Sequence, residues 1–137
     1  LEECVRRKTV CHGNYIYHNI LMKDDTIATT NFDKVCIGVQ MTDLYCFVRK
    51  VMEKNNWNIS FGKLIVDEYN KVNPISKDQM NILYVLLLYP EKFWKITNFY
   101  YNARKSWVPR RNIQKLQSIS EQSKDKNTFL ENLKQGL

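Results

Sequence analysis

The fold is decided by the stretch Cys11-His12-Gly13-Asn14-Tyr15-Ile16-Tyr17-His18-Asn19-Ile20-Leu21, which is followed twelve residues after Asn19 by Asn31-Phe32-Asp33. The glycine predicts a tight turn, because Gly adopts a positive φ at little cost. Short β-prone runs flank this turn and the polar reversal Lys23-Asp24-Asp25, and they predict strands over residues 9–11, 19–22 and 26–30. We therefore expect region 9–37 to form a small β-hairpin unit.

The apolar pattern changes after Gly38 from a period of two to a period of about 3.6 residues, which is typical of helices. We predict that Thr42, Ser60 and Ser76 cap the first three helices, and that Ser76 forms a capping box with Gln79. Further helices are expected over residues 91–106, 110–121 and 127–135, with a flexible link over residues 118–127.

The length of 137 residues fits one domain with one core. We therefore expect a single α+β, mainly helical domain over residues 1–137, in which the hairpin region 9–37 is followed by a helical region 41–137. The sequence contains no run of about eighteen apolar residues, so it predicts no membrane span. Because the chain opens on Leu1 with no glycine-rich phosphate loop before the turn, we expect it to be part of a longer protein or a trimmed one.

Positive charge exceeds negative charge in this sequence, with 21 Lys and Arg against 14 Asp and Glu and a formal net charge of +7. This excess permits attraction to nucleic acids, anionic surfaces or acidic proteins without choosing among them. The cysteines lie among apolar neighbours without C-x-x-C spacing, which predicts reduced, buried thiols. They are Cys4, Cys11, Cys36 and Cys46. A zinc site of Cys11, His12, His18 and Cys36 is disfavoured, because the adjacent Cys11 and His12 point to opposite faces of a strand.

The motifs of the hairpin region and the acid that follows them form an ordered set. They are His12-Gly13-Asn14 with Asn19, then Asn31-Phe32-Asp33, then Asp43-Leu44. This set resembles the catalytic core of the aminoglycoside phosphotransferase and choline kinase group, whose pattern is H-G-D-x-x-x-x-N, a strand pair, I-D-F-D or I-D-W-E, and D-L. Within that group the chain looks most like the CotS-type bacterial spore coat proteins. The resemblance implies the C-terminal lobe of a protein-kinase-like fold.

The resemblance also assigns a role to each matching position. It places the catalytic base at Asn14, metal ligands at Asn19 and Asn31, the brace of the turn at His12, and structural hydrogen-bonding acids at Asp33 and Asp43. Both positions where the group has a catalytic or metal-binding Asp are therefore Asn in this chain. An amide cannot accept a proton at neutral pH, and loss of a general base costs about 10²- to 10⁴-fold in rate. Loss of one carboxylate beside a cation removes about 4 kcal/mol of attraction at an effective dielectric constant of about 20.

The resemblance implies a noncatalytic structural or scaffolding component of the bacterial spore coat, with a vestigial nucleotide and metal site at Asn19, Asn31 and Asp33. We expect no cofactor, no membrane contact, other spore coat proteins as partners, and self-association as a further option. Such a protein would be made in the mother-cell cytoplasm and assembled on the coat. Two alternatives stay open: a small-molecule phosphotransferase lobe that acts on a hydroxyl substrate with a separate nucleotide-binding lobe, and a nucleic-acid-binding module.

The segment from Lys92 to Lys115 contains seven basic residues, no acid and interleaved aromatic residues. The spacing of Phe93, Ile96 and Tyr100 favours a core stripe, with the charges on a solvated face. The same composition also suits a protein interface or single-stranded nucleic acid. As the interface hypothesis, we expect an assembly surface carried by Arg104, Trp107, Arg110 and Arg111.

Overall fold

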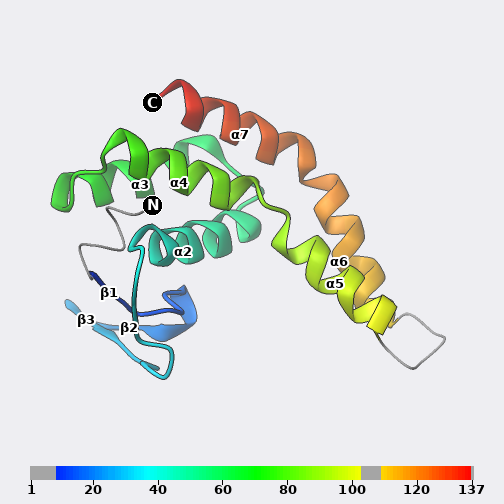
Figure 1. The fold of residues 1–137 in the computed structure, drawn as a ribbon, viewed down its shortest axis with the longest axis horizontal. Helices are drawn as coiled ribbons and strands as arrows, with labels where there is room; N and C mark the ends of the chain where they lie inside the picture. The colour runs from blue at the N-terminus through cyan, green and yellow to red at the C-terminus, as the bar shows by residue number, and fades with distance from the viewer. Residues whose placement is uncertain (1–8, 103–108, 137) are drawn as a thin grey trace.

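The computed structural model describes residues 9–102 and 109–136, and it places a small β region against a group of packed helices (Figure 1). Strands β1 (Thr9–Cys11) and β4 (Cys36–Gly38) form one antiparallel pair. Strands β2 (Ile20–Lys23) and β3 (Thr26–Thr29) form a second pair, joined as a hairpin. The short helix η1 (Tyr17–Asn19) leads from the His12 turn into β2.

The predicted hairpin is confirmed, and its reversal is made by Asp24 with a φ of 50°. Asp is one of the few residue types that adopt this left-handed conformation readily. The pairing of β1 with β4 was not predicted, since β4 is only three residues long and its partner lies far back in the sequence. This second pair fixes both ends of the region that carries His12-Gly13-Asn14, Asn19 and Asn31-Phe32-Asp33.

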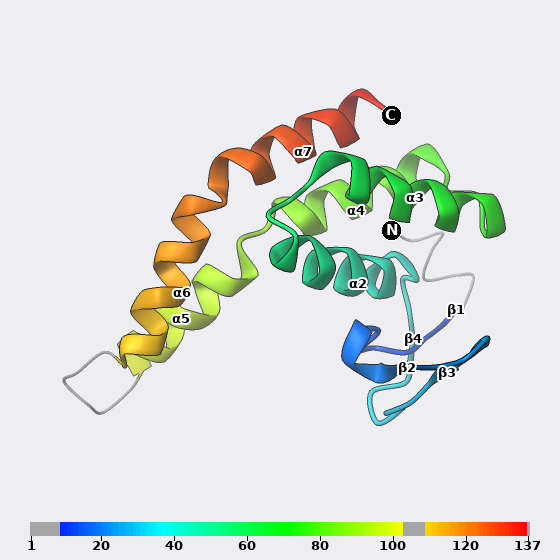
Figure 2. The same cartoon turned by 180° about the vertical axis from the view of Figure 1, so that it is seen from behind.

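Six helices follow in the described chain: α2 (Met41–Lys54), α3 (Ile59–Val72), α4 (Lys77–Leu88), α5 (Glu91–Asn102), α6 (Arg110–Glu121) and α7 (Ser123–Gln135). Helices α2, α3, α4 and α7 pack together, whereas α5 and α6 run away from them as an antiparallel pair (Figure 2). None of these helices is both long enough and apolar enough to cross a membrane.

Only one of the three predicted helix caps is confirmed. The Ser76 hydroxyl accepts the Gln79 N–H at 3.2 Å, and the Gln79 side chain accepts the Ser76 N–H at 2.8 Å, which completes the capping box. Thr42 and Ser60 were wrong as caps, because each lies inside its helix. The Thr42 hydroxyl donates to the Val39 carbonyl instead, and α3 is capped by Asn58.

The predicted flexible link over residues 118–127 is wrong. Helix α6 continues to Glu121 and α7 begins at Ser123, so only Gln122 separates them. The Gln122 side-chain amide donates to the Glu53 carbonyl at 3.2 Å and to Asn56 Oδ1 at 3.1 Å. These two bonds attach the junction to the end of α2.

The core lies where α2, α4 and α7 meet. Its most buried side chains include Val48, Met52, Leu83, Leu87, Phe129 and Leu130. Helix α3 joins this core at Gly62, where a Cβ would lie 2.4 Å from Phe129 Cε2 and 2.7 Å from Met52 Cε. The absence of a side chain at Gly62 therefore allows α3 to pack closely against the other helices.

Candidate functional site

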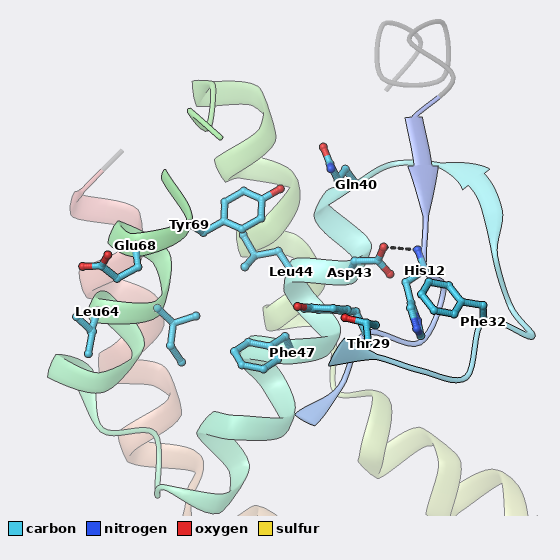
Figure 3. A pocket seen from close by; sticks show the side chains of 12 residues that line it. His12, Thr29, Phe32, Gln40, Asp43, Leu44, Phe47, Leu64, Glu68 and Tyr69 are labelled. Carbon is cyan, nitrogen blue, oxygen red and sulfur yellow. Dashed lines mark hydrogen bonds between the residues drawn. The ribbon is translucent and has the colours of Figure 1, made fainter. Parts of the chain in front are cut away.

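The turn at residues 12–14 is attached to the first turn of α2 by Asp43. Its Oδ2 accepts the His12 backbone N–H at 2.6 Å and its Oδ1 accepts the Gly13 N–H at 2.9 Å, and Figure 3 shows the first of these bonds. Gly13 has a φ of 74°, and a Cβ there would lie 2.1 Å from the Lys34 carbonyl oxygen. The turn therefore needs both the carboxylate and the glycine.

The His12 side chain braces the turn from the opposite direction. Its Nδ1 accepts the Asn14 N–H at 3.2 Å, and its Nε2 lies 3.0 Å from the Thr30 carbonyl oxygen. This pattern places the ring proton on Nε2, which donates to Thr30. The ring is nearly buried and lies 4.8 Å from the Phe32 ring, centre to centre. The imidazole therefore joins the turn to the end of β3.

Two amides from distant parts of the sequence meet beside the turn. The buried Asn19 donates from Nδ2 to the Asn14 carbonyl at 2.8 Å, and this bond fixes the orientation of its amide. Asn19 Oδ1 then accepts from Asn31 Nδ2 at 3.3 Å. Asn31 has a φ of 66°, a conformation that Asn tolerates better than most residues. The structure thus brings Asn19 and Asn31 together as a neutral amide pair.

The sequence from residue 2 to residue 133 matches the family described as "Spore coat putative kinase YutH". The chain belongs to this family. A curated relative, "Spore coat protein S" of Bacillus subtilis (strain 168), is 28% identical over 134 residues, which cover 93% of this chain and 38% of the relative. The crystal structure of an aminoglycoside phosphotransferase from Alicyclobacillus acidocaldarius subsp. acidocaldarius DSM 446 matches with a TM-score of 0.85 at 19% identity. That match covers 97% of this chain and 42% of the other chain.

Family membership confirms the resemblance to the spore coat proteins, and the structural match confirms the α+β, mainly helical, kinase-like fold. At 19% identity the structural match establishes the fold alone. The chain spans about two fifths of the length of the relative and of the solved phosphotransferase.

The remaining positions that the family pattern singles out behave differently from one another. Asp43 forms the structural hydrogen bonds expected of it, whereas Asp33 is exposed and its carboxylate makes no hydrogen bond with residues 9–102 or 109–136. Asn14 contributes its backbone N–H and carbonyl to the site, and its side chain makes no hydrogen bond to that same part of the chain. Within those residues no group of three or more His, Cys, Asp and Glu side chains could hold a metal ion.

Two hollows adjoin the turn. The first, of about 700 Å³, lies between the β region, α2 and α3 and is lined mainly by apolar and aromatic side chains such as Phe32, Phe47 and Tyr69 (Figure 3). Its lining includes none of the three amides Asn14, Asn19 and Asn31. The second, of about 670 Å³, is lined by Asn14 together with basic side chains from four other segments. Sequence reasoning missed this basic hollow, because its residues are scattered along the chain.

The segment from Lys92 to Lys115, which spans most of α5 and the first part of α6, was predicted from the spacing of its apolar residues to form a core stripe. Ile96 is buried, but Phe93 and Tyr100 are 42% and 52% exposed, so the core interpretation is wrong for these two rings. Arg110 and Arg111 are exposed at the start of α6. Arg104 and Trp107 lie outside the described residues. The assembly surface stays a prediction. Exposed aromatic side chains on α5, such as Phe93 and Tyr100, are further candidates for it.

Proposed function

We propose that the chain is a noncatalytic structural component of the spore coat, acting as one kinase-like lobe over residues 1–137. The observation that carries this proposal is the hydrogen bond from Asn31 Nδ2 to Asn19 Oδ1. Asn31 supplies the N–H donor and Asn19 supplies the oxygen acceptor, so the two side chains bind each other without an added ion. The former catalytic positions then act as hydrogen-bonding groups that hold the turn in shape.

The phosphotransferase fold implies a magnesium ion bound with a nucleotide, and the residues present do not fit that ion. Mg²⁺ prefers oxygen ligands, commonly one or two carboxylates. Asn19 Oδ1 faces an N–H donor rather than an open space between oxygens, and neither Asn19 nor Asn31 is charged. These residues therefore do not support a reaction step through a metal.

The catalytic-base position supports the same proposal. Asn14 is an amide, which has no basic lone pair with a pKa near neutrality and cannot accept the proton of an attacking hydroxyl. Its backbone carbonyl is occupied by the Asn19 amide, and its backbone N–H is occupied by His12. The role that fits Asn14 is therefore to link these two side chains within the turn.

The second candidate function is phosphoryl transfer to a hydroxyl substrate with a separate nucleotide-binding lobe. Two observations favour it: the kinase in the description of the family and the phosphotransferase fold itself. The lining of the basic hollow opposes an aminoglycoside as the substrate, because aminoglycosides are polycations and six cationic side chains line the hollow at Asn14. Phosphoryl transfer by this chain therefore requires a substrate other than an aminoglycoside and a catalytic base other than residue 14.

Calorimetric titration with Mg-ATP, together with phosphate-release assays on hydroxyl substrates, separates the two candidates. We expect the wild-type protein to show no saturable, magnesium-dependent heat at micromolar nucleotide and no phosphate release. The Asn14→Asp/Asn31→Asp double variant restores both carboxylates and is the matched comparison for any gain of magnesium binding. Saturable, magnesium-dependent binding by the wild-type protein would contradict the proposal.

We further propose that the protein is made in the mother-cell cytoplasm and assembles on the coat with other coat proteins or with itself. Arg110 and Arg111 are the described part of the expected interaction surface. In sporulating cells, Asn14→Ala should leave incorporation into extracted coats unchanged, whereas Arg110→Glu/Arg111→Glu should reduce it on immunoblots. Normal incorporation of the arginine variant, or loss of a well-folded Asn14→Ala protein, would oppose this assembly model.

A further inference from the structure

The lining of the basic hollow beside Asn14 has a large excess of positive over negative side chains. It lies between the turn, α2, α5 and α6, and it encloses about 670 Å³, a volume typical of sites for small molecules. Six cationic side chains line it: Lys34, Arg49, Lys50, Lys92, Lys95 and Lys115. Only two acids, Glu53 and Glu91, line it with them. Positive charge is therefore concentrated here from four separate segments of the chain, the loop that carries Lys34 and helices α2, α5 and α6.

Both acids are already engaged by cations on the wall of the hollow. Arg49 contacts Glu53 at 3.3 Å and Glu91 at 3.1 Å, Lys92 lies 3.9 Å from Glu53, and Lys95 pairs with Glu91. Tyr45 also donates its hydroxyl to Glu91 at 2.7 Å. The two carboxylates are thus shared among three cations, and they have little capacity left to neutralise others.

Three ammonium groups have no such partner among the described residues. Within residues 9–102 and 109–136, no carboxylate lies within 4 Å of the side-chain nitrogens of Lys34, Lys50 and Lys115. In the same part of the chain Arg49 Nε is buried without a hydrogen-bond partner, although Arg49 lines the hollow. A buried donor without a partner costs free energy, and clustered like charges repel. An anion in the hollow would relieve the repulsion among these ammonium groups.

We propose that this hollow binds a small anion that carries two or more phosphate or carboxylate groups. The ammonium groups of Lys34, Lys50 and Lys115 come from a loop, α2 and α6, so a ligand with several anionic groups suits them better than one with a single group. Lysine ammonium groups bind phosphate or carboxylate oxygens as point charges, so they accept either chemistry. The proposal goes beyond the structural role, and it holds whether or not the chain transfers phosphate.

Isothermal titration calorimetry on the purified full chain tests the proposal without nucleotide or magnesium. One arm uses inorganic pyrophosphate and the other uses citrate, which distinguishes phosphate from carboxylate ligands. We expect saturable binding at a ratio of one anion per chain in at least one arm, weakening as salt rises. No saturable binding in either arm would overturn the proposal.

A charge-reversal pair assigns the binding to the hollow. Lys50→Glu/Lys115→Glu places acids on two walls and should weaken binding by at least about tenfold, which corresponds to about 1.4 kcal/mol. Lys63→Glu/Lys124→Glu changes the net charge equally on exposed parts of α3 and α7 outside the hollow, and it should bind within about twofold of wild type. Equal weakening by both pairs would show nonspecific attraction to a basic chain and would refute the site.

The exposed Lys34 provides a second variant should the α2 and α6 changes disturb folding. Lys34→Gln removes from a loop one charge that pairs with no carboxylate in the described part of the chain, and it should weaken binding severalfold with an unchanged unfolding midpoint. Unaltered affinity in a folded Lys34→Gln protein would count against the proposed site. Binding of long poly-glutamate without binding of pyrophosphate or citrate would also overturn the proposal, because it would identify an acidic protein segment as the partner.

Discussion

Replacing Asn31 with Asp inverts the contact that closes the amide pair. In the wild-type chain Asn31 Nδ2 lies 3.3 Å from Asn19 Oδ1 and donates to it. In the variant a carboxylate oxygen would face the same Oδ1, and two acceptors without a hydrogen between them repel each other. Asp also tolerates the φ of 66° at this position, so the change affects the side chain rather than the backbone.

Without a metal ion, Asn31→Asp should lower the free energy of unfolding only slightly. A bound divalent cation should reverse that loss. The lost hydrogen bond contributes about 1 kcal/mol, and the new charge is largely solvated because residue 31 is exposed. This loss lowers the unfolding midpoint in EDTA by about 3–5 °C for a chain of this size. A divalent cation can bridge the two oxygens of the variant. With a Kd of about 1 mM, about 10 mM Mg²⁺ would return about 1.4 kcal/mol.

The assay is thermal unfolding followed by circular dichroism, in EDTA and in Mg²⁺, on wild type, Asn31→Asp and Asn56→Asp. Asn56 is a matched control, since it is exposed, has a φ of 48° and accepts a hydrogen bond from Gln122 through Oδ1. Asp at position 56 adds the same charge and keeps that acceptor. Only Asn31→Asp should gain stability from Mg²⁺. A wild-type midpoint that rises as much as that of Asn31→Asp would refute the reasoning.

Two further substitutions test the hydrogen bonds of Asp43 at the turn and of Glu91 beside the basic hollow. Asp43→Ala removes the acceptor of two backbone N–H groups, and it should lower the free energy of unfolding in urea by about 2–4 kcal/mol. The control Asp67→Ala, at an exposed position, should lower it by less than about 0.5 kcal/mol. Equal losses in the two variants would oppose the structural role of Asp43. Burial by itself would raise the pKa of Glu91, but hydrogen bonds from Lys95 and Tyr45 and the charge of Arg49 lower it below 4.5. Glu91 therefore contributes stability above that pH and loses it as pH falls through the lowered pKa. Unfolding midpoints between about pH 5 and pH 3 should fall less steeply in Glu91→Gln, and parallel curves would contradict this.

The sequence predicts some of the parts of the fold that depend on neighbouring residues, although the caps expected at Thr42 and Ser60 were wrong. The Lys23-Asp24-Asp25 reversal and the Ser76 capping box are local structures, and both form as predicted. The junction at Gln122 shows the opposite case. Polar composition around it indicates a link, but hydrogen bonds to the distant Glu53 and Asn56 allow the chain to continue as helix on both sides. Such contacts depend on packing and leave no local pattern.

The candidate site divides in the same way. The spacing of His12, Asn19, Asn31 and Asp43 could be recognised because an ordered motif set carries it. The basic hollow could not be recognised from the sequence, since its six cationic side chains come from a loop and from α2, α5 and α6. Taken singly, each of them has the pattern of an ordinary solvated charge. Exposure of Phe93 and Tyr100 was missed for a related reason: their helical spacing predicts an inward face, but α5 leaves the packed helices and pairs with α6.

The distribution of charge at the turn follows from what each side chain must satisfy. Asp43 accepts two backbone N–H groups that have no other acceptor in the described chain, so a neutral or shorter side chain there would leave donors unpaired. Asn19 and Asn31 satisfy each other, so no charge or ion is needed between them. A carboxylate at position 31 without a cation would disrupt that balance. The anionic group that maintains the turn is thus separable from the anionic groups that phosphoryl transfer requires, so this fold can stay intact with amides at the two positions where the phosphotransferase pattern has Asp.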